Sequence, residues 1–190
     1  MIKVLIFDCF GVLIGDGLER VLRQHEINSP GIRQRITPIV SSVNTGKLDP
    51  AVSGKQMAEA LGLDHAAMDI LIKEGELVNT ELLSWILEQK EHYKIVLLTN
   101  ISRPSLEKRF TKSFLSEYFD LQVVSGEQGI EKPNPKIYQY IFEQMDVLPN
   151  ECVFMDDRQN YLTPASKLGI HTILFKDNEQ FFSEITQYLA

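Results

Sequence analysis

Several polar side chains suited to phosphate chemistry stand directly after short apolar runs or in a stiff, proline-rich loop. They are Asp8, Thr99, Asn100, Lys132, Asp156 and Asp157. Short apolar runs are typical of buried strands, and in an open parallel sheet ligands bind beyond the carboxyl ends of the strands. If these runs are neighbouring strands of one sheet, the six residues converge on one crevice.

The three aspartates in this set indicate a divalent cation. Carboxylates crowded into one crevice raise one another's pKa unless a cation lies between them. A site built from oxygen ligands suits Mg²⁺, which completes its octahedron with water and substrate oxygens. We therefore predict a Mg²⁺ site formed by Asp8, Asp156 and Asp157.

Lys132 and Thr99 provide complementary groups for a phosphoryl ligand. The lysine supplies a fixed positive charge, and the threonine hydroxyl supplies a hydrogen-bond donor for phosphoryl oxygens. A carboxylate beside such a ligand can attack phosphorus, so Asp8 is the candidate nucleophile of an aspartyl-phosphate mechanism. Asn100, directly after Thr99, is a further candidate for phosphate binding.

The elements that must position these residues follow from an alternation of β-branched runs and longer amphipathic segments. The expected strands are Lys3–Phe7, Lys94–Leu98, Leu121–Val124, Cys152–Met155 and Thr172–Phe175. The expected helices between them lie near residues 104–113, 134–145, 160–168 and 178–189. This alternation is typical of right-handed βαβ units, so we predict an α/β fold with a parallel sheet flanked by helices.

The region from Gly15 to His92 departs from this alternation, because it contains helix-like segments and no convincing strand. Helices are expected to begin at Asp49-Pro50, at Asp64 and at Asn79-Thr80, where the first residue suits a helix N-cap. We therefore predict an all-helical subdomain, residues 15–92, inserted into a core formed by residues 1–14 and 93–190.

Composition narrows the classes of partner. The chain has 190 residues, 44% of them hydrophobic, and a formal net charge of −7, so we expect a globular protein that does not bind nucleic acid, whose phosphates an acidic surface repels. No apolar run approaches the roughly 20 residues of a membrane span, and the N-terminus does not resemble a signal peptide. Cys9 and Cys152 lie in apolar surroundings typical of free thiols in a reducing compartment, so the predicted location is the cytoplasm.

Taken in order, the four motifs resemble those of the haloacid dehalogenase superfamily. The matching segments are FDCFGVL around Asp8, LLTN ending at Asn100, GIEKPNPKIY around Lys132 and VFMDDRQNYLTPASKLGIHTILF, which begins at Val153. The resemblance implies a Rossmann-like core and a helical cap that closes over the site and governs substrate choice. Asn160 and residues 165–172 resemble the small phosphatase-like branch of the superfamily.

The resemblance also implies a role for each matched residue. Asp8 would be both nucleophile and metal ligand, and the backbone carbonyl of Phe10 would be another ligand. The remaining residues would hold the phosphoryl group (Thr99, Lys132) or the Mg²⁺ (Asp156, Asp157).

Phe10 is a departure from the family pattern. Phosphatases of the superfamily usually carry an aspartate two residues after the nucleophile, which protonates the leaving group and then activates water. Such acid–base assistance is worth typically about 10²–10⁴-fold, so a phenyl ring at this position predicts a weak or atypical phosphatase. Superfamily dehalogenases carry an aromatic residue there, which keeps a 2-haloacid dehalogenase open as an alternative. A non-catalytic protein that binds a phosphorylated ligand is the second alternative.

Two further sets of charged residues need an interpretation. Asp16 lies near the junction of core and cap, where it either replaces the missing acid or, more simply, caps the first helix of the cap. A basic helix face follows Thr99 and comprises Arg103, Lys108, Arg109 and Lys112. We interpret it as ordinary solvent-exposed surface unless the structure directs these side chains toward the site.

The acidic pair Asp156-Asp157 favours a phosphatase over a dehalogenase. Dehalogenases of the superfamily need no Mg²⁺ and usually lack such an acidic pair. The sequence therefore predicts a Mg²⁺-dependent hydrolase of small phosphorylated metabolites, a phosphatase that acts through an aspartyl-phosphate on Asp8. We expect it to be a monomer or a homodimer.

Overall fold

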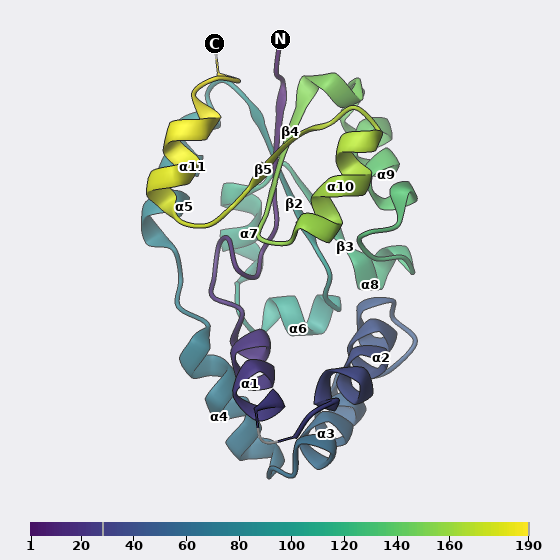
Figure 1. Cartoon of the computed structure of the whole chain (residues 1–190). Coiled ribbons are helices and arrows are strands. Elements are labelled where there is room, and N and C mark those ends of the chain that lie inside the picture. Colours follow the sequence, from purple (N-terminus) through teal and green to yellow (C-terminus); the bar gives the residue numbers. More distant parts are fainter. Residues whose placement is uncertain (28, 190) are drawn as a thin grey trace.

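A parallel sheet lies at the centre of the α/β core (Figure 1). The computed structural model describes residues 1–27 and 29–189, and within them the sheet has five strands in the order β3-β2-β1-β4-β5. The strands are β1 (Val4–Phe7), β2 (Lys94–Thr99), β3 (Leu121–Val124), β4 (Cys152–Asp156) and β5 (His171–Leu174). Each expected strand is present, with its ends within one residue of the prediction, and the expected parallel, Rossmann-like arrangement is confirmed.

The register of the sheet aligns the strand ends that carry the candidate residues. Phe7 of β1 pairs with Leu97 of β2 on one side and with Met155 of β4 on the other. The main-chain N–H of Asp8 donates to the carbonyl of Met155 at 2.9 Å. Asp8 and Asp156 therefore leave the sheet at the same level.

Helices cover both faces of the sheet. One face packs against α5 (Thr80–Gln89), α6 (Arg103–Glu107), α7 (Lys112–Tyr118) and α11 (Asn178–Ile185), and the other against α9 (Pro135–Met145) and α10 (Gln159–Lys167). The short helices α8 (Ser125–Gln128) and η1 (Pro149–Glu151) lie in connections. The predicted single helix over 104–113 is wrong: the Thr111 hydroxyl accepts a hydrogen bond from the Phe114 N–H and begins a new helix, α7.

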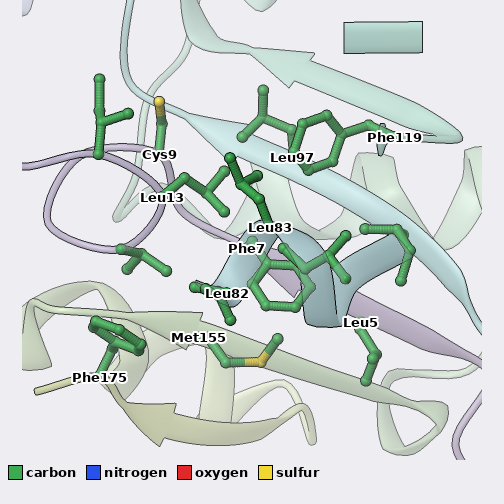
Figure 2. Close-up of a cluster of buried hydrophobic side chains, with 14 of the residues drawn as sticks. Leu5, Phe7, Cys9, Leu13, Leu82, Leu83, Leu97, Phe119, Met155 and Phe175 are labelled. Atoms are coloured by element: carbon green, nitrogen blue, oxygen red, sulfur yellow. The ribbon is translucent and has the colours of Figure 1, made fainter. Parts of the chain in front are cut away.

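An apolar cluster lies between the sheet and the helices on each of its faces. Figure 2 shows residues of the cluster on the face covered by α5, α6, α7 and α11. This cluster joins Leu5 and Phe7 of β1 to Leu82 and Leu83 of α5. Cys9 is buried in the same cluster. Its side chain therefore points into the core, as strand alternation predicts for the neighbour of a residue that faces the crevice.

Four helices form the cap, which lies beyond the carboxyl edge of the sheet in Figure 1. They are α1 (Gly17–Glu26), α2 (Ile32–Asn44), α3 (Pro50–Leu61) and α4 (His65–Gly75), and their buried side chains form an apolar cluster of their own. As expected, α3 and α4 begin after Asp49 and Asp64, whose carboxylates accept N–H groups of the first turn. No helix in the described part of the chain is both long and apolar enough to cross a bilayer.

Helix α5 falls inside the range 15–92 expected for the cap but packs differently. It begins after Asn79 as predicted, and its buried residues Leu82, Leu83 and Ile86 belong to the sheet cluster. We therefore propose that the cap ends before α5, because this helix buries its apolar side against the core.

The two chain segments that connect core and cap pair with each other. The N–H of Gly15 donates to the carbonyl of Leu77, and the N–H of Asn79 donates to the carbonyl of Leu13, both at 2.9 Å. A Cβ atom at Gly15 would come within 2.1 Å of the carbonyl oxygen of Gly75. This close approach requires glycine and fixes the two connections side by side.

Candidate active site

Lys132 is the centre of the buried charges at the carboxyl edge of the sheet. Its ammonium group lies 2.7 Å from Asp8 Oδ1 and 2.7 Å from Asp156 Oδ2, and it donates to the carbonyl of Leu98 at 3.1 Å. Its side chain is 0% exposed. All three ammonium hydrogens thus have acceptors, and Lys132 joins the ends of β1, β2 and β4.

Asn100 holds the loop that carries this lysine. Its Oδ1 accepts from the Lys132 N–H and its Nδ2 donates to the Lys132 carbonyl, each at 2.9 Å. The amide therefore bonds at both ends to one peptide segment. The side chain thereby positions Lys132, and because only one Nδ2 hydrogen is used in these bonds, its phosphate contact stays a prediction.

The three aspartates lie together as the sequence predicted. Asp8, Asp156 and Asp157 each place a carboxylate oxygen so that these atoms are all within 4.8 Å of one another. Asp156 is held on both oxygens, by Lys132 at Oδ2 and by the Arg158 N–H at Oδ1. A cluster of carboxylate oxygens at this spacing is the ligand set that Mg²⁺ prefers.

Burial sets the electrostatics of this cluster. It raises the pKa of Asp8 to about 7, helped by the negative charge of Asp156 and opposed by Lys132. Burial, and then the charge of Asp8, raise the pKa of Asp157 to about 6. The pKa of Lys132 is also raised, because the two carboxylates that share it outweigh the cost of burying its own charge. The cluster holds more acid than its one lysine neutralises, and a divalent cation would supply the remaining charge.

Two buried oxygen atoms at the site lack a hydrogen-bond partner among the described residues. They are Thr99 Oγ1 and Asp157 Oδ1. A buried polar atom left without a hydrogen bond costs about 1–3 kcal/mol, so native structures rarely keep one without a reason. One is a hydroxyl suited to a phosphoryl oxygen and the other a carboxylate suited to a cation, so the residues present fit the predicted ligands.

Gly11 brings the loop after β1 against the acidic pair. Its φ of 82° lies in the left-handed region, and a Cβ atom there would lie 2.5 Å from Asp157 Cγ. Only glycine combines this backbone conformation with this approach. The motif residue Gly11 thus allows the nucleophile loop and Asp157 to share the crevice.

Phe10 is partly buried and packs at the edge of the sheet cluster. Arg109 lies over its ring, with Cζ at 5.2 Å from the ring centroid. The guanidinium is held by Glu76 Oε1, at 2.8 Å from Nε and 2.5 Å from Nη2, and by the carbonyl of Ser105 at 2.9 Å. Arg109 is therefore aimed inward at the nucleophile loop. The exception stated for the basic face therefore applies to this residue.

The other members of that face do not point to the nucleophile loop. Arg103 forms a two-pronged ion pair with Glu127 at 2.7 and 2.8 Å, and Lys108 and Lys112 are exposed. The sequence offers no signal that separates Arg109 from them, because the distinction depends on where the chain turns between α6 and α7.

Asp16 is the N-cap of α1, which confirms the simpler of its two interpretations. Its Oδ1 accepts from the Glu19 N–H at 2.9 Å, and its Oδ2 accepts from Arg158 Nη2 at 2.6 Å. Arg158 was not among the predicted residues. Its position directly after Asp157 is the signal that could have identified it, since a cation beside an acidic pair in a crevice is expected to have a partner.

Tyr161 was also missed by the sequence analysis. Lys132 Nζ lies 5.1 Å from the centroid of its ring, and Arg158 Cζ lies 5.8 Å from it. Burial raises the pKa of its hydroxyl. The ring therefore forms an aromatic wall beside the charged cluster.

Comparison with known proteins identifies the family. A model of the haloacid dehalogenase-like hydrolases matches residues 2–169. The chain belongs to this hydrolase family, and the resemblance of its four motifs is confirmed.

Two curated relatives illustrate the range of the family. The chain is 23% identical over 206 aligned residues to a D-ribitol-5-phosphate phosphatase of Bacteroides thetaiotaomicron, with 100% of this chain and 99% of the relative covered. It is 38% identical over 71 residues to the bifunctional epoxide hydrolase 2 of Rattus norvegicus, covering 37% of this chain. That match spans only 13% of the rat protein, and a similar match spans 24% of the Sus scrofa protein.

A solved structure shares the fold over almost the whole chain. It is a haloacid dehalogenase family enzyme of Bacteroides thetaiotaomicron, crystallised in complex with magnesium and inorganic phosphate. The TM-score is 0.74 at 24% identity, with 96% of this chain and 100% of that chain covered. At this identity the likeness establishes the fold.

Proposed function

We propose that the protein is a Mg²⁺-dependent phosphatase of small phosphorylated metabolites that forms an aspartyl-phosphate on Asp8. One observation carries the proposal: three carboxylate oxygens lie within 4.8 Å of one another, beside two buried polar atoms, on Thr99 and Asp157, that have no hydrogen-bond partner among the described residues. A cation and a phosphoryl group would together satisfy all of them.

The residues that would hold the metal are Asp8, Asp156, Asp157 and the backbone carbonyl of Phe10. When bound, Mg²⁺ neutralises charge on phosphoryl oxygens and allows an anionic carboxylate to approach them. A neighbour of the same fold carries magnesium and phosphate, which supports this part of the proposal.

Asp8 is positioned for attack by its hydrogen bonds. Its Oδ1 accepts from the Cys9 N–H and from Lys132, each at 2.7 Å. Because both bonds of the described structure go to Oδ1, Oδ2 is available to attack phosphorus. Lys132 keeps its proton and holds the carboxylate in orientation, while the Thr99 hydroxyl donates to a phosphoryl oxygen.

Similarity to a phosphatase of a phosphorylated sugar alcohol over the whole chain supports the class of substrate. Two cap residues contact segments next to the site, Asp16 through Arg158 and Ser41 through Glu131, so we expect the cap to limit the size of the group attached to phosphate. The cytoplasmic location and the monomeric or homodimeric state stay predictions from the sequence.

Phe10 favours the dehalogenase alternative, because halide leaves carbon without a proton. The unpartnered oxygens of Thr99 and Asp157 favour phosphate, since a haloacid substrate needs neither a cation nor this hydroxyl. The two activities are distinguishable by product, so both belong in one experiment.

The test is phosphate release from a panel of phosphate esters and acyl phosphates, with Mg²⁺ and with EDTA, and halide release from 2-haloacids. We expect phosphate release that EDTA abolishes, and that Asp8→Asn lowers by at least about 10³-fold because it removes the nucleophile. Halide release without phosphate release would establish the dehalogenase alternative. Mg²⁺-dependent binding of inorganic phosphate by calorimetry, with no turnover of any substrate, would establish the non-catalytic one.

A further inference from the structure

The side of the nucleophile occupied by Phe10 offers no transferable proton. Its phenyl ring is covered by the Arg109 guanidinium, 5.2 Å from the ring centroid. That guanidinium is fixed by Glu76 and by the carbonyl of Ser105. An arginine keeps its proton under all physiological conditions, so the group over Phe10 contributes charge but does not act as an acid.

The nearby carboxylates outside the aspartate cluster are already engaged. Asp16 accepts from Arg158 at 2.6 Å, and Glu76 accepts from Arg109 at 2.5 and 2.8 Å. A carboxylate that accepts hydrogen bonds from a guanidinium has no proton to give. Glu131, directly before Lys132, accepts from the Ser41 hydroxyl of the cap at 2.5 Å.

The remaining titratable groups beside Asp8 are also poor proton carriers. The Cys9 thiol is buried in the apolar cluster behind the strand, away from the crevice. Lys132 donates its three ammonium hydrogens to three acceptors, which hold it in place as a fixed positive charge. The site thus holds and orients a phosphoryl group with fixed charges. Apart from the three aspartates, which are assigned to the nucleophile and the metal, the residues described around the nucleophile do not include a free acid or base.

We propose that this site acts on phosphates whose leaving group is a weak base, such as acyl and aryl phosphates, and that its aspartyl-phosphate is long-lived. The inference rests on the proposed phosphatase function and specifies its substrate class. In the first step a bond forms between an Asp8 oxygen and phosphorus. The bond from phosphorus to the leaving oxygen breaks, and the electron pair departs with that oxygen as a carboxylate or phenolate, which needs no proton.

The second step lacks a base for the same reason. The oxygen of a water molecule bonds to phosphorus, the bond from phosphorus to Asp8 breaks, and its electron pair returns to the carboxylate. The proton of that water goes to the phosphate or to bulk solvent, because the described side chains do not provide an acceptor at Phe10. Slow hydrolysis after a fast first step causes the phosphorylated enzyme to accumulate.

The experiment compares leaving groups on the full-length protein with saturating Mg²⁺. The substrates are acetyl phosphate, 4-nitrophenyl phosphate, phenyl phosphate and glycerol phosphate, in order of increasing leaving-group basicity. We expect kcat/KM to fall along this series, with glycerol phosphate at least ~10²-fold below 4-nitrophenyl phosphate. Stopped-flow measurement should show a burst of 4-nitrophenolate that approaches one equivalent per site.

Phe10→Asp tests the cause, because it introduces the missing carboxyl group. It should raise kcat/KM for glycerol phosphate by ~10²-fold, change that for 4-nitrophenyl phosphate by only a few-fold, and remove the burst. Phe10→Asn is the matched control, since asparagine has the shape of aspartate but no transferable carboxyl proton, and it should give no gain. Glu131→Gln should leave the dependence on leaving group unchanged.

The outcomes separate this inference from the proposed function. Equal kcat/KM values for alkyl and aryl phosphates, or a selective loss of alkyl phosphate hydrolysis in Glu131→Gln, overturn the inference while the phosphatase function stands. The absence of phosphate release from every substrate, acetyl phosphate included, overturns both. The leaving-group series on the unmodified protein decides the question even if a Phe10 variant does not fold.

Discussion

The charges at the sheet edge and the charges that join core to cap differ in how far they are removed from water. Lys132 and Asp156 have side chains 0% exposed, and Asp8 is 7% exposed. The pair between Arg158 and Asp16, which links the core to the first cap helix, is 38% and 15% exposed. Coulomb interactions are strong in the first environment and weakened by water and salt in the second. The structure thus holds the reacting groups by strong buried interactions, whereas the ion pair between core and cap is the weaker of the two.

Removal of Lys132 should have the largest effect on stability. Lys132→Met leaves Asp8 and Asp156 buried without their shared cation, and breaking a buried pair in this way costs about 3–5 kcal/mol. Urea unfolding at neutral pH, without metal, measures the loss. Lys136→Met is the control, because this lysine is exposed in the first turn of α9, four residues from Lys132, and it should change stability by less than about 0.5 kcal/mol. Equal losses in the two variants would contradict the contrast between the regions.

Removal of the negative charge of Asp8 should raise the free energy of unfolding, whereas removal of Lys132 lowers it. Its pKa is about 7 in the folded protein against 3.8 normally. A carboxyl group whose pKa is raised by folding contributes stability that is fully present below about pH 4 and lost as the pH rises through about 7. Asp8→Asn does not ionise, so in EDTA it should match the parent protein near pH 4 and exceed it in free energy of unfolding by on the order of 4 kcal/mol at pH 8.

Chemical denaturation across pH 4 to 8 measures this difference. A constant difference between Asp8→Asn and the parent protein would show that burial of the Asp8 charge does not destabilise the fold. Added Mg²⁺ should reduce the advantage of the variant, because the ion stabilises the ionised carboxylate of the parent protein.

The link between core and cap should give the smallest effect. In a double-mutant cycle, Asp16→Asn removes the charge but retains an efficient helix N-cap, and Arg158→Gln removes its partner. The coupling energy should be below about 1 kcal/mol and should fall in high salt. The control is Arg23→Gln, because Arg23 is exposed and bonds only within the cap, to Glu19. A coupling energy above about 2 kcal/mol that does not fall in high salt would contradict the prediction, because it would show that this pair behaves like the buried charges around Lys132.

The buried residues at the edge of the sheet are easier to predict from the sequence than the contacts that surround them. Apolar runs followed by Asp8, Thr99 and Asp156 identify strand ends, because a parallel sheet leaves few other places for such runs. The five strands were therefore predictable to within one residue. The clustering of the aspartates was predictable only on the condition that β1 and β4 are neighbours, which the strand order of the structure confirms.

Contacts that depend on side-chain direction or on chain turns were not predictable in this way. The amide of Asn100 turned out to bracket Lys132, since its two hydrogen bonds depend on where a distant loop returns. Arg109 covers Phe10 because the chain turns between α6 and α7, where one helix was expected. Helix α5 joins the core because its leucines meet the sheet, which helical periodicity alone does not reveal.

The paired connections beside Gly15 and Leu77 have one more consequence. The chain enters and leaves the cap at neighbouring points joined by main-chain hydrogen bonds. These bonds hold the two ends of the cap segment, roughly sixty residues long, close together, so the cap itself does not have to supply the entropy cost of closing this loop. For the sheet, the whole cap is topologically no more than an enlarged surface loop. We therefore expect that the cap helices could be exchanged for others between these two connections without a change in the pairing of the strands.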